Sequence, residues 1–307
     1  MKALVTGGAG FIGSHLVRRL VAEGNSVTVV DDLSTGRREN LVGSDIELVT
    51  RDLARDPLDD LVKDVDAIFH LAAVPSVPRS VREPLRSHEA AATATLRLLE
   101  AARAAGVGTF VNSSSSSVYG NVARPPMTET MPTLPRSPYA VAKLAAEGYT
   151  RVFASLHGMR TVSLRYFNVF GPRQDPTSAY AAALPRFVTA YLRREPPKVY
   201  DDGRQSRDFT HVANVVEANV LAARAPALGG ESVNIAAGEP RSVLDLLHAI
   251  ADVFGYWLEP EFLPARPGDI RDSHADISLA RKLLHYAPVM GFSEGLKETV
   301  ASLRDQA

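Results

Sequence analysis

An α/β protein is predicted, with a doubly wound parallel sheet followed by a smaller, mixed α/β region. Over the first half of the chain, short apolar runs alternate with segments of helical periodicity, which is typical of repeated strand–helix–strand units. The first apolar run stops at a glycine-rich turn. In doubly wound sheets, such a turn follows a strand at the edge of the sheet that binds ligands. Beyond residue 167, proline becomes denser and the elements become shorter.

Six strands are predicted in the first part, each from a short apolar run that suits a strand buried on both faces. They span residues 2–6, 26–31, 46–50, 67–71, 108–112 and 161–167. After the first strand, apolar residues recur at helical spacing from Ile12, which predicts a helix that ends at Gly24. Longer helices are predicted over residues 85–105, which are rich in alanine, and over residues 138–155.

Composition excludes several classes of protein. Hydrophobic residues make up 45% and charged residues 22% of the 307 positions, which are values of a globular chain with a core. A net charge of −1 provides no basic field for nucleic acid or for an anionic membrane. The absence of cysteine excludes disulfides and thiolate metal sites, and no metal is predicted. Without a signal-like start or a long apolar stretch, we expect a soluble cytoplasmic protein.

A phosphate-binding loop is predicted between the first strand and the first helix. Gly7, Gly10 and Gly13 form a G-x-x-G-x-x-G pattern, in which residues without a Cβ allow a tight turn and the close approach of a pyrophosphate. The pyrophosphate would lie on free N–H groups at the start of the helix. Asp31 ends the second strand, where an acid can accept both ribose hydroxyls of adenosine and repel a 2′-phosphate. The acid at Asp31 favours NAD over NADP. Because the strand, loop, helix and acid follow one another in register, the glycines are better explained by a dinucleotide site than by a turn that serves packing alone.

We therefore expect a Rossmann NAD-binding domain over residues 1–167 and a substrate-binding region over residues 168–307, with room for the chain to cross between them. Segments 195–203 and 260–268 are expected to be loops or short strands. Asp52 and Leu53 end the third strand and are expected to meet the adenine, although a solvated turn acid explains Asp52 nearly as well.

Five serines at 113–117 follow the predicted fifth strand. Such a run can be a flexible linker, but this one leaves the carboxyl end of a central strand, where open α/β sheets bind ligands. Tyr139 and Lys143 lie four positions apart in a predicted helix and share a face. An ammonium at Lys143 and a nicotinium ring would both lower the pKa of the Tyr139 phenol, which makes it a better base. Such a pair occurs by chance in many helices, but its position after a dinucleotide loop and a serine favours catalysis.

Together these motifs resemble the extended short-chain dehydrogenase/reductase family, and within it the UDP-sugar 4-epimerases. The resemblance covers essentially the whole chain. Besides the loop, Asp31 and the Tyr–Lys pair, it depends on further motifs: His70-Leu71-Ala72-Ala73, Ser113-Ser114-Ser115 before Val118-Tyr119-Gly120, Arg165-Tyr166-Phe167-Asn168 through Arg173, Arg207-Asp208-Phe209, and Arg266-Pro267-Gly268-Asp269.

The resemblance implies roles for individual residues. Ser115 and Tyr139 match the residues that contact the sugar O4, and Lys143 matches the lysine that bonds the nicotinamide ribose. The implied NAD-binding residues are Gly7, Gly10, Phe11, Ile12, Gly13, Asp31, Asp32, Ser34, Thr35, Gly36, Asp52, Leu53, Leu71, Ala72, Ala73, Ser113, Tyr139, Lys143 and Tyr166. The implied substrate-binding residues are Ser76, Val77, Ser115, Ser117, Tyr139, Asn168, Ala183, Leu184, Tyr200, Arg207, Arg266, Asp269 and Ser273.

Within the substrate set, the resemblance assigns most residues to the nucleotide. Asn168 matches a residue at the diphosphate, and Tyr200 matches an aromatic that stacks on uracil. Arg207 and Arg266 match two phosphate-binding arginines, and Asp269 matches an acid on the uridine ribose. The planar fork of arginine suits phosphate, although a surface salt bridge explains either arginine alone equally well.

Some positions depart from the family pattern. Ser116-Ser117 stands where the dehydratases carry Asp-Glu and where UDP-glucuronate decarboxylases carry a Glu, which argues against both reactions. Ala91 replaces an asparagine that is usual in its helix, and Ala182-Ala183 occupies the region of a substrate-binding asparagine. Ala213-Asn214 replaces a pair of acids. None of these departures removes a catalytic group.

The expected function is inversion of C4 of a UDP-sugar through a transient 4-keto sugar, by a homodimer with bound NAD. UDP-glucose, UDP-N-acetylglucosamine and UDP-glucuronate remain open as substrates. Ser273 falls where a large aromatic closes the pocket of hexose-only members, so its small side chain favours an N-acetyl group, unless it only lines a solvent channel. A nucleotide-sugar reductase, a dehydratase variant and a catalytically silent NAD-binding regulator are the competing functions.

Overall fold

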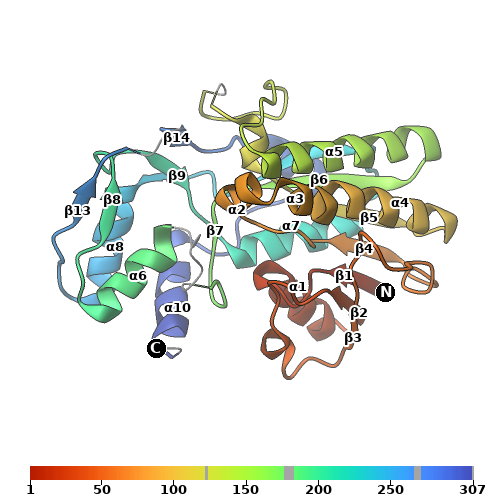
Figure 1. Ribbon diagram of the computed structural model, residues 1–307, viewed down its shortest axis with the longest axis horizontal. Helices are drawn as coiled ribbons and strands as arrows, with labels where there is room; N and C mark the ends of the chain where they lie inside the picture. The colour runs from red at the N-terminus through yellow and green to blue at the C-terminus, as the bar shows by residue number, and fades with distance from the viewer. Residues whose placement is uncertain (122–123, 176–182, 266–270, 306–307) are drawn as a thin grey trace.

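A computed structural model describes residues 1–121, 124–175, 183–265 and 271–305. Within these residues, seven parallel strands form one sheet in the order β11-β6-β5-β4-β1-β2-β3 (Figure 1). The strands are β1 (Lys2–Thr6), β2 (Ser26–Asp31), β3 (Glu47–Thr50), β4 (Ala67–His70), β5 (Thr109–Ser115), β6 (Arg160–Tyr166) and β11 (Glu231–Ile235). The order reverses between β1 and β4, which is where doubly wound sheets bind ligands at their carboxyl ends.

Helices cover both faces of this sheet, and two apolar cores fill the layers. Helices α1 (Phe11–Ala22) and α7 (Val212–Arg224) contact each other on one face, where Val5 is buried. Helix α4 (Ala94–Ala104) and helix α5 (Pro138–His157) lie side by side on the other, where Leu4 is buried (Figure 1). Successive residues of β1 thus supply opposite cores, as the pleat of a strand requires. The predicted doubly wound α/β fold is confirmed.

Four features of the sheet and its helices differ from the prediction. β11 is not among the six predicted strands, and it joins β6 from a position after residue 168. β5 continues through Ser115, because its hydroxyls find buried partners. The predicted helix over 85–105 is broken into α3 (Pro84–His88), a π-helical turn η2 (Glu89–Thr93) and α4. Helix α5 extends two residues beyond the prediction, to His157. The division of the chain at residue 168 stays a prediction.

The C-terminal part contains a third apolar core formed by α6 (Ala183–Arg193), α8 (Val243–Phe254) and α10 (Phe292–Arg304). The segments expected as loops or short strands contain β8 (Lys198–Tyr200) and β13 (Glu261–Leu263), which pair in parallel. The remaining short strands are β7 (Val169–Phe170) with β10 (Thr210–His211), and β9 (Ser206–Asp208) between β12 (Pro240–Ser242) and β14 (Asp272–Ser273). The remaining helices are α2 (Val77–Arg82), α9 (Ser278–Leu284), η1 (Arg38–Leu41) and η3 (Ser116–Tyr119).

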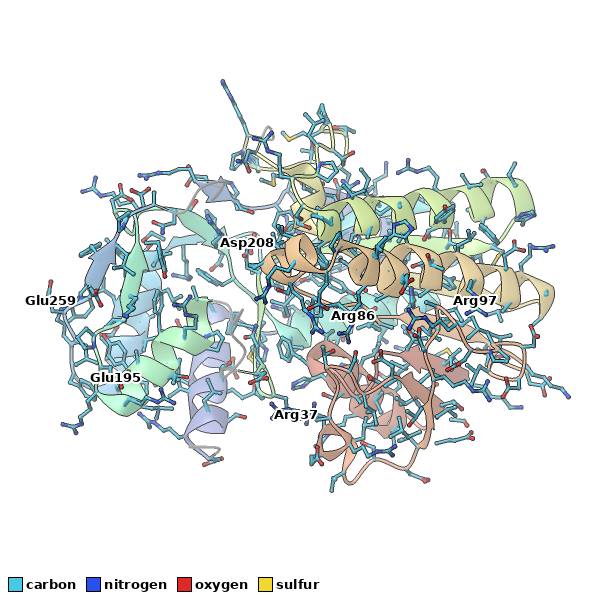
Figure 2. All side chains as sticks on the ribbon, viewed as in Figure 1. Arg37, Arg86, Arg97, Glu195, Asp208 and Glu259 are labelled. Carbon is cyan, nitrogen blue, oxygen red and sulfur yellow. The ribbon has the colours of Figure 1, made fainter. Side chains whose placement is uncertain are left out.

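A buried acid connects the small sheets to the segment after β11. Asp208, labelled in Figure 2, ends β9, and its carboxylate accepts hydrogen bonds from the backbone N–H groups of Ala237 (2.9 Å) and Gly238 (3.0 Å). These bonds fix the C-terminal part against the large sheet. Among the described residues, no helix is both long and apolar enough to cross a membrane.

Candidate active site

One cleft of about 1580 Å³ opens at the carboxyl ends of the central strands. Every residue predicted to bind NAD lines it, from the loop after β1 to Tyr166 at the end of β6. The C-terminal part closes the same cleft with Thr189, Leu192 and Arg193 of α6 and with Leu303 of α10. The fold therefore gathers in one place a set of residues that is scattered over the first 166 positions.

The glycine loop leaves room only for backbone. A Cβ on Gly13 would lie 2.1 Å from the carbonyl oxygen of Gly7, and a Cβ on Gly7 would lie 2.7 Å from the backbone nitrogen of Ala72. Gly7 also adopts a φ of +69°, which disfavours other residues. Helix α1 begins after Gly10 without a side-chain cap among the described residues, so its first N–H groups face the cleft. This geometry fits a pyrophosphate.

The carboxylate of Asp31, at the end of β2, is oriented by backbone hydrogen bonds. Its two carboxylate oxygens accept hydrogen bonds from the N–H groups of Ala9 (3.0 Å) and Leu33 (2.9 Å). Burial raises the pKa of Asp31, and these two hydrogen bonds oppose the rise. A Cβ on Gly36 would lie 2.7 Å from the same carboxylate, so the neighbouring loop packs closely on it. The free lone pairs can accept from ribose hydroxyls, so the residues present fit the adenosine half of NAD.

Lys143 reaches from α5 to the end of β5. Its Nζ donates hydrogen bonds to the carbonyl oxygen (2.7 Å) and to the Oγ (3.2 Å) of Ser113. Burial lowers the pKa of Lys143 to about 8, and the negative charge of Glu147 opposes this shift. The amine is thus fixed in place and poised to carry a proton near neutral pH.

Tyr139 begins the same helix face and is hydrogen-bonded to Ser115. Burial raises the pKa of Tyr139, and the hydrogen bond with Ser115 opposes the rise. The sequence predicts that Lys143 and an oxidised nicotinamide lower the pKa of Tyr139. In this structure burial has the larger influence and raises that pKa. The serine, tyrosine and lysine nevertheless meet at the carboxyl end of β5, where an alcohol could be deprotonated.

The predicted substrate residues are more dispersed. Ser76 lines the cleft and caps α2 by accepting a hydrogen bond from the N–H of Arg79. Arg207 on β9 pairs in register with the buried Ser273 on β14. The Oγ of Ser117 is buried without a hydrogen-bond partner among the described residues.

Of the described substrate residues, only Ser76 and Tyr139 line the cleft, and the others, which include Arg207 and Ser273, lie outside its lining. Asn168 is exposed between β6 and β7, with a φ of 32°. The other described ones are Val77 at the start of α2, Ala183 and Leu184 at the start of α6, and Tyr200 at the end of β8. Arg266, Asp269 and Ala182 lie outside the described residues.

Two groups of residues near the site had no predicted role. Arg173 lines the cleft, and its Nη1 donates to Ser14 on α1 (3.1 Å). Behind the site, Glu147 and Arg165 form a buried ion pair that also bonds Ser114. Arg165 begins the motif Arg165-Tyr166-Phe167-Asn168, but its partner is 18 positions away, and nothing local in the sequence identifies that partner.

Known proteins resemble the chain over its full length. Residues 3–236 match the NAD dependent epimerase/dehydratase family. A UDP-glucose 4-epimerase of Mycolicibacterium smegmatis is 41% identical over the full length of both chains. The chain belongs to this family. The predicted membership of its extended short-chain dehydrogenase/reductase, UDP-sugar 4-epimerase branch is thereby confirmed, and NAD is confirmed as the cofactor.

Solved structures of this epimerase family match the whole fold. A UDP-N-acetylglucosamine 4-epimerase from Methanobrevibacter ruminantium, in complex with UDP-N-acetylmuramic acid, is 41% identical with a TM-score of 0.96, over 100% of this chain and 99% of that one. A UDP-glucuronic acid 4-epimerase from Bacillus cereus, with UDP-glucuronic acid and NAD, is 32% identical with a TM-score of 0.92 over both full chains. The relatives thus share the reaction at C4 and differ in the sugar.

Proposed function

We propose that this epimerase inverts C4 of UDP-N-acetylglucosamine and UDP-glucose with NAD held through the cycle. The observation that carries the proposal is the hydrogen-bonded pair of Ser115 and Tyr139 beside Lys143, at the carboxyl end of the central strand β5. Ser116-Ser117 follows this pair, so the acid and base that a dehydratase of the family needs have no counterpart there.

The chain's residues have defined tasks in this reaction. Bound NAD would supply a reversible hydride acceptor for C4. Tyr139 takes the proton from the O4 hydroxyl, and Ser115 orients O4 through its own hydroxyl. Lys143, anchored on Ser113, holds positive charge near the phenolate that forms. The 4-keto sugar then turns in the pocket, so that the opposite face of C4 would receive the returning hydride, and Tyr139 gives the proton back to O4.

The breadth of substrates is supported by a small side chain. Ser273 is buried and lies in register with Arg207, the residue proposed to hold the diphosphate. A serine there leaves volume for an acetamido group at C2. UDP-glucuronate remains the second candidate substrate, because the UDP-glucuronic acid 4-epimerase from Bacillus cereus matches this protein over its full length.

We also propose a homodimer formed through α5. Val141, Tyr149, Val152 and Leu156 are exposed on this helix and fall on one side at helical spacing. Val81 and Leu85, on the neighbouring helices, are also exposed. A contiguous apolar stripe of this kind is typical of a protein interface. Light scattering at micromolar concentration checks the stoichiometry.

The function is tested by incubating the purified protein with UDP-glucose, UDP-N-acetylglucosamine and UDP-glucuronate, without added NAD, and resolving the C4 epimers. We expect both neutral sugars to equilibrate with their epimers. Turnover of UDP-glucuronate alone would favour the second candidate. Net release of NADH would indicate a dehydrogenase, and bound NAD without turnover of any sugar would indicate a silent regulator.

A further inference from the structure

A buried ion pair lies behind the catalytic residues. The side chains of Glu147 on α5 and Arg165 on β6 are 1% and 3% exposed. The guanidinium donates to both carboxylate oxygens, over 2.9 and 2.7 Å. Replacing such a pair by apolar residues of similar volume is often neutral or stabilising, so stability alone is a weak reason for its presence.

The carboxylate of Glu147 also holds the strand that carries the catalytic serine. The Oγ of Ser114 donates to one of its oxygens over 2.5 Å, and the Oγ of Ser232 on β11 donates to the other over 3.0 Å. Ser114 stands between Ser113, which accepts from Lys143, and Ser115, which bonds Tyr139. Glu147 therefore fixes the register of the segment on which both contacts depend.

Glu147 lies one helical turn after Lys143 and acts on its charge. Burial lowers the pKa of Lys143, and Glu147 opposes the shift. Arg165 compensates the charge of this buried carboxylate. Burial alone would lower the pKa of Arg165, but its hydrogen bonds and charge interaction with Glu147 raise it, so the arginine stays charged.

The other titratable groups around Lys143 carry no negative charge near neutral pH. His70 on β4 stays neutral, because burial and then the charge of Lys143 lower its pKa to about 3. Burial raises the pKa of Tyr139 on α5 and of Tyr166 on β6, so both phenols are neutral. Among the described groups, Glu147 is thus the anion that favours the charged amine.

We propose that Glu147 is a positioning residue of the epimerase: it keeps Lys143 in the ammonium form beside Tyr139 and holds the catalytic serine segment through Ser114, while Arg165 compensates its charge. This inference rests on the proposed function for its kinetic consequence, but the charge state of Lys143 can be measured independently of any substrate.

The test variant combines Glu147→Gln with Arg165→Met. It removes both charges, whereas Glu147→Gln alone leaves Arg165 buried without a counter-ion and endangers folding. Ser232→Ala is the matched control, because it removes a hydrogen bond to Glu147 and keeps the charge. The first measurement is the titration of Lys143, followed by NMR of ¹³C-labelled lysine and assigned with Lys143→Arg. The second is the pH profile of kcat and KM for C4 inversion.

In the double variant, we expect Lys143 to lose its proton at a lower pH than in the wild type. The basic limb of the kcat profile should move in the same direction, with kcat near pH 8 lower by about tenfold and KM changed by less than about threefold. The Ser232→Ala control should change neither midpoint. A folded double variant with a wild-type Lys143 titration and profile would overturn the inference. A wild type that inverts no UDP-sugar would overturn the proposed function instead, and the Lys143 titration would still decide the role of Glu147.

Discussion

The phenol of Tyr119 donates a 2.7 Å hydrogen bond to the side-chain oxygen of Asn234, across 115 positions of the sequence. Tyr119 ends η3, which begins within the serine run, and Asn234 lies in β11. The Nδ2 of Asn234 also donates to the carbonyl oxygen of Met127 (2.9 Å), and both side chains are fully buried. The strand contributed by the second half of the chain thus supports the turn that follows the catalytic serine.

Replacing Asn234 by alanine should destabilise the protein substantially. The Tyr119 hydroxyl then keeps only the hydrogen bond that it accepts from Arg165, so its own proton loses its acceptor in the interior. The Met127 carbonyl still accepts a hydrogen bond from the N–H of Asp276. An unsatisfied buried donor costs roughly 1–3 kcal/mol, so we expect a loss of about 1–3 kcal/mol in the free energy of unfolding. Chemical denaturation measures it, with the exposed Asn121→Ala as the control, which should stay near zero. A loss no larger than that of the control would contradict the role of Asn234.

Local patterns in the sequence predicted the cofactor half of the site, because its signals are local. Gly7, Gly10, Gly13 and Asp31 lie within one strand–helix–strand unit, and the fold brings them to one cleft. β11 was missed, since a five-residue strand between loops has little periodicity of its own, and its partner β6 is far away in the chain. The Glu147–Arg165 pair was missed because its two residues lie 18 positions apart. The charge of Arg165 within a strand does not show which acid compensates it.

Gly13→Ala should deplete the protein of NAD. The new Cβ would meet the Gly7 carbonyl at 2.1 Å, so the loop must move away from the start of α1. Cofactor released by denaturation and quantified by chromatography should fall by about tenfold or more, which corresponds to only 1.4 kcal/mol of binding free energy. Gly148→Ala is the matched control, because a Cβ there meets nothing within 4 Å. Wild-type NAD content in Gly13→Ala would refute the loop assignment.

Tyr139→Phe should abolish most turnover and preserve nucleotide binding. The variant lacks the group that takes the O4 proton, and such a group contributes roughly 10²–10⁴-fold to a rate. We expect kcat for C4 inversion to fall by about a thousandfold while calorimetry shows UDP affinity within about twofold of the wild type. Tyr149→Phe makes the same change on the face of the same helix that is proposed to contact a second subunit, and it should leave kcat unchanged because Tyr149 does not line the cleft. If Tyr139→Phe retained near-normal turnover, another residue would have to be the base.

Acidification should destabilise the protein through His70. Burial lowers its pKa from 6.5 to about 3, and both ring nitrogens are bonded, to Thr6 (2.7 Å) and Thr95 (2.9 Å). The unfolded chain binds a proton below its ordinary pKa and the folded protein does not, so stability is full above about 6.5 and falls as the pH drops toward 3. His70 alone should remove about 2 kcal/mol from the free energy of unfolding between about pH 7 and about pH 5.

The measurement compares two slopes. His70→Gln cannot take up this proton, so the difference between wild type and variant isolates His70 from the carboxylates that titrate in the same range. Denaturation at both pH values should show a pH dependence flatter in the variant by about 2 kcal/mol, whatever its absolute stability. Equal slopes would mean that His70 is protonated in the folded protein.

Substrate width should depend on Ser273. Between the two hydride transfers the keto sugar must turn, and an acetamido group at C2 sweeps a larger volume than a hydroxyl. Ser273 is buried and paired in register with Arg207, so its side chain lies where the diphosphate arm of the substrate is proposed to be held. With the small serine in place, we expect turnover of UDP-N-acetylglucosamine at least comparable with that of UDP-glucose.

Ser273→Tyr should then reduce kcat/KM for UDP-N-acetylglucosamine at least about tenfold more than for UDP-glucose, because a clash of a few atoms easily exceeds the roughly 1.4 kcal/mol that tenfold discrimination requires. Ser273→Ala should leave the ratio unchanged, since it adds no volume, and it also shows whether the hydroxyl itself matters. Equal losses for both sugars in the tyrosine variant, or a wild type that ignores the N-acetyl sugar, would show that Ser273 is not the gate. A glucose- or glucuronate-type substrate would then become the better assignment.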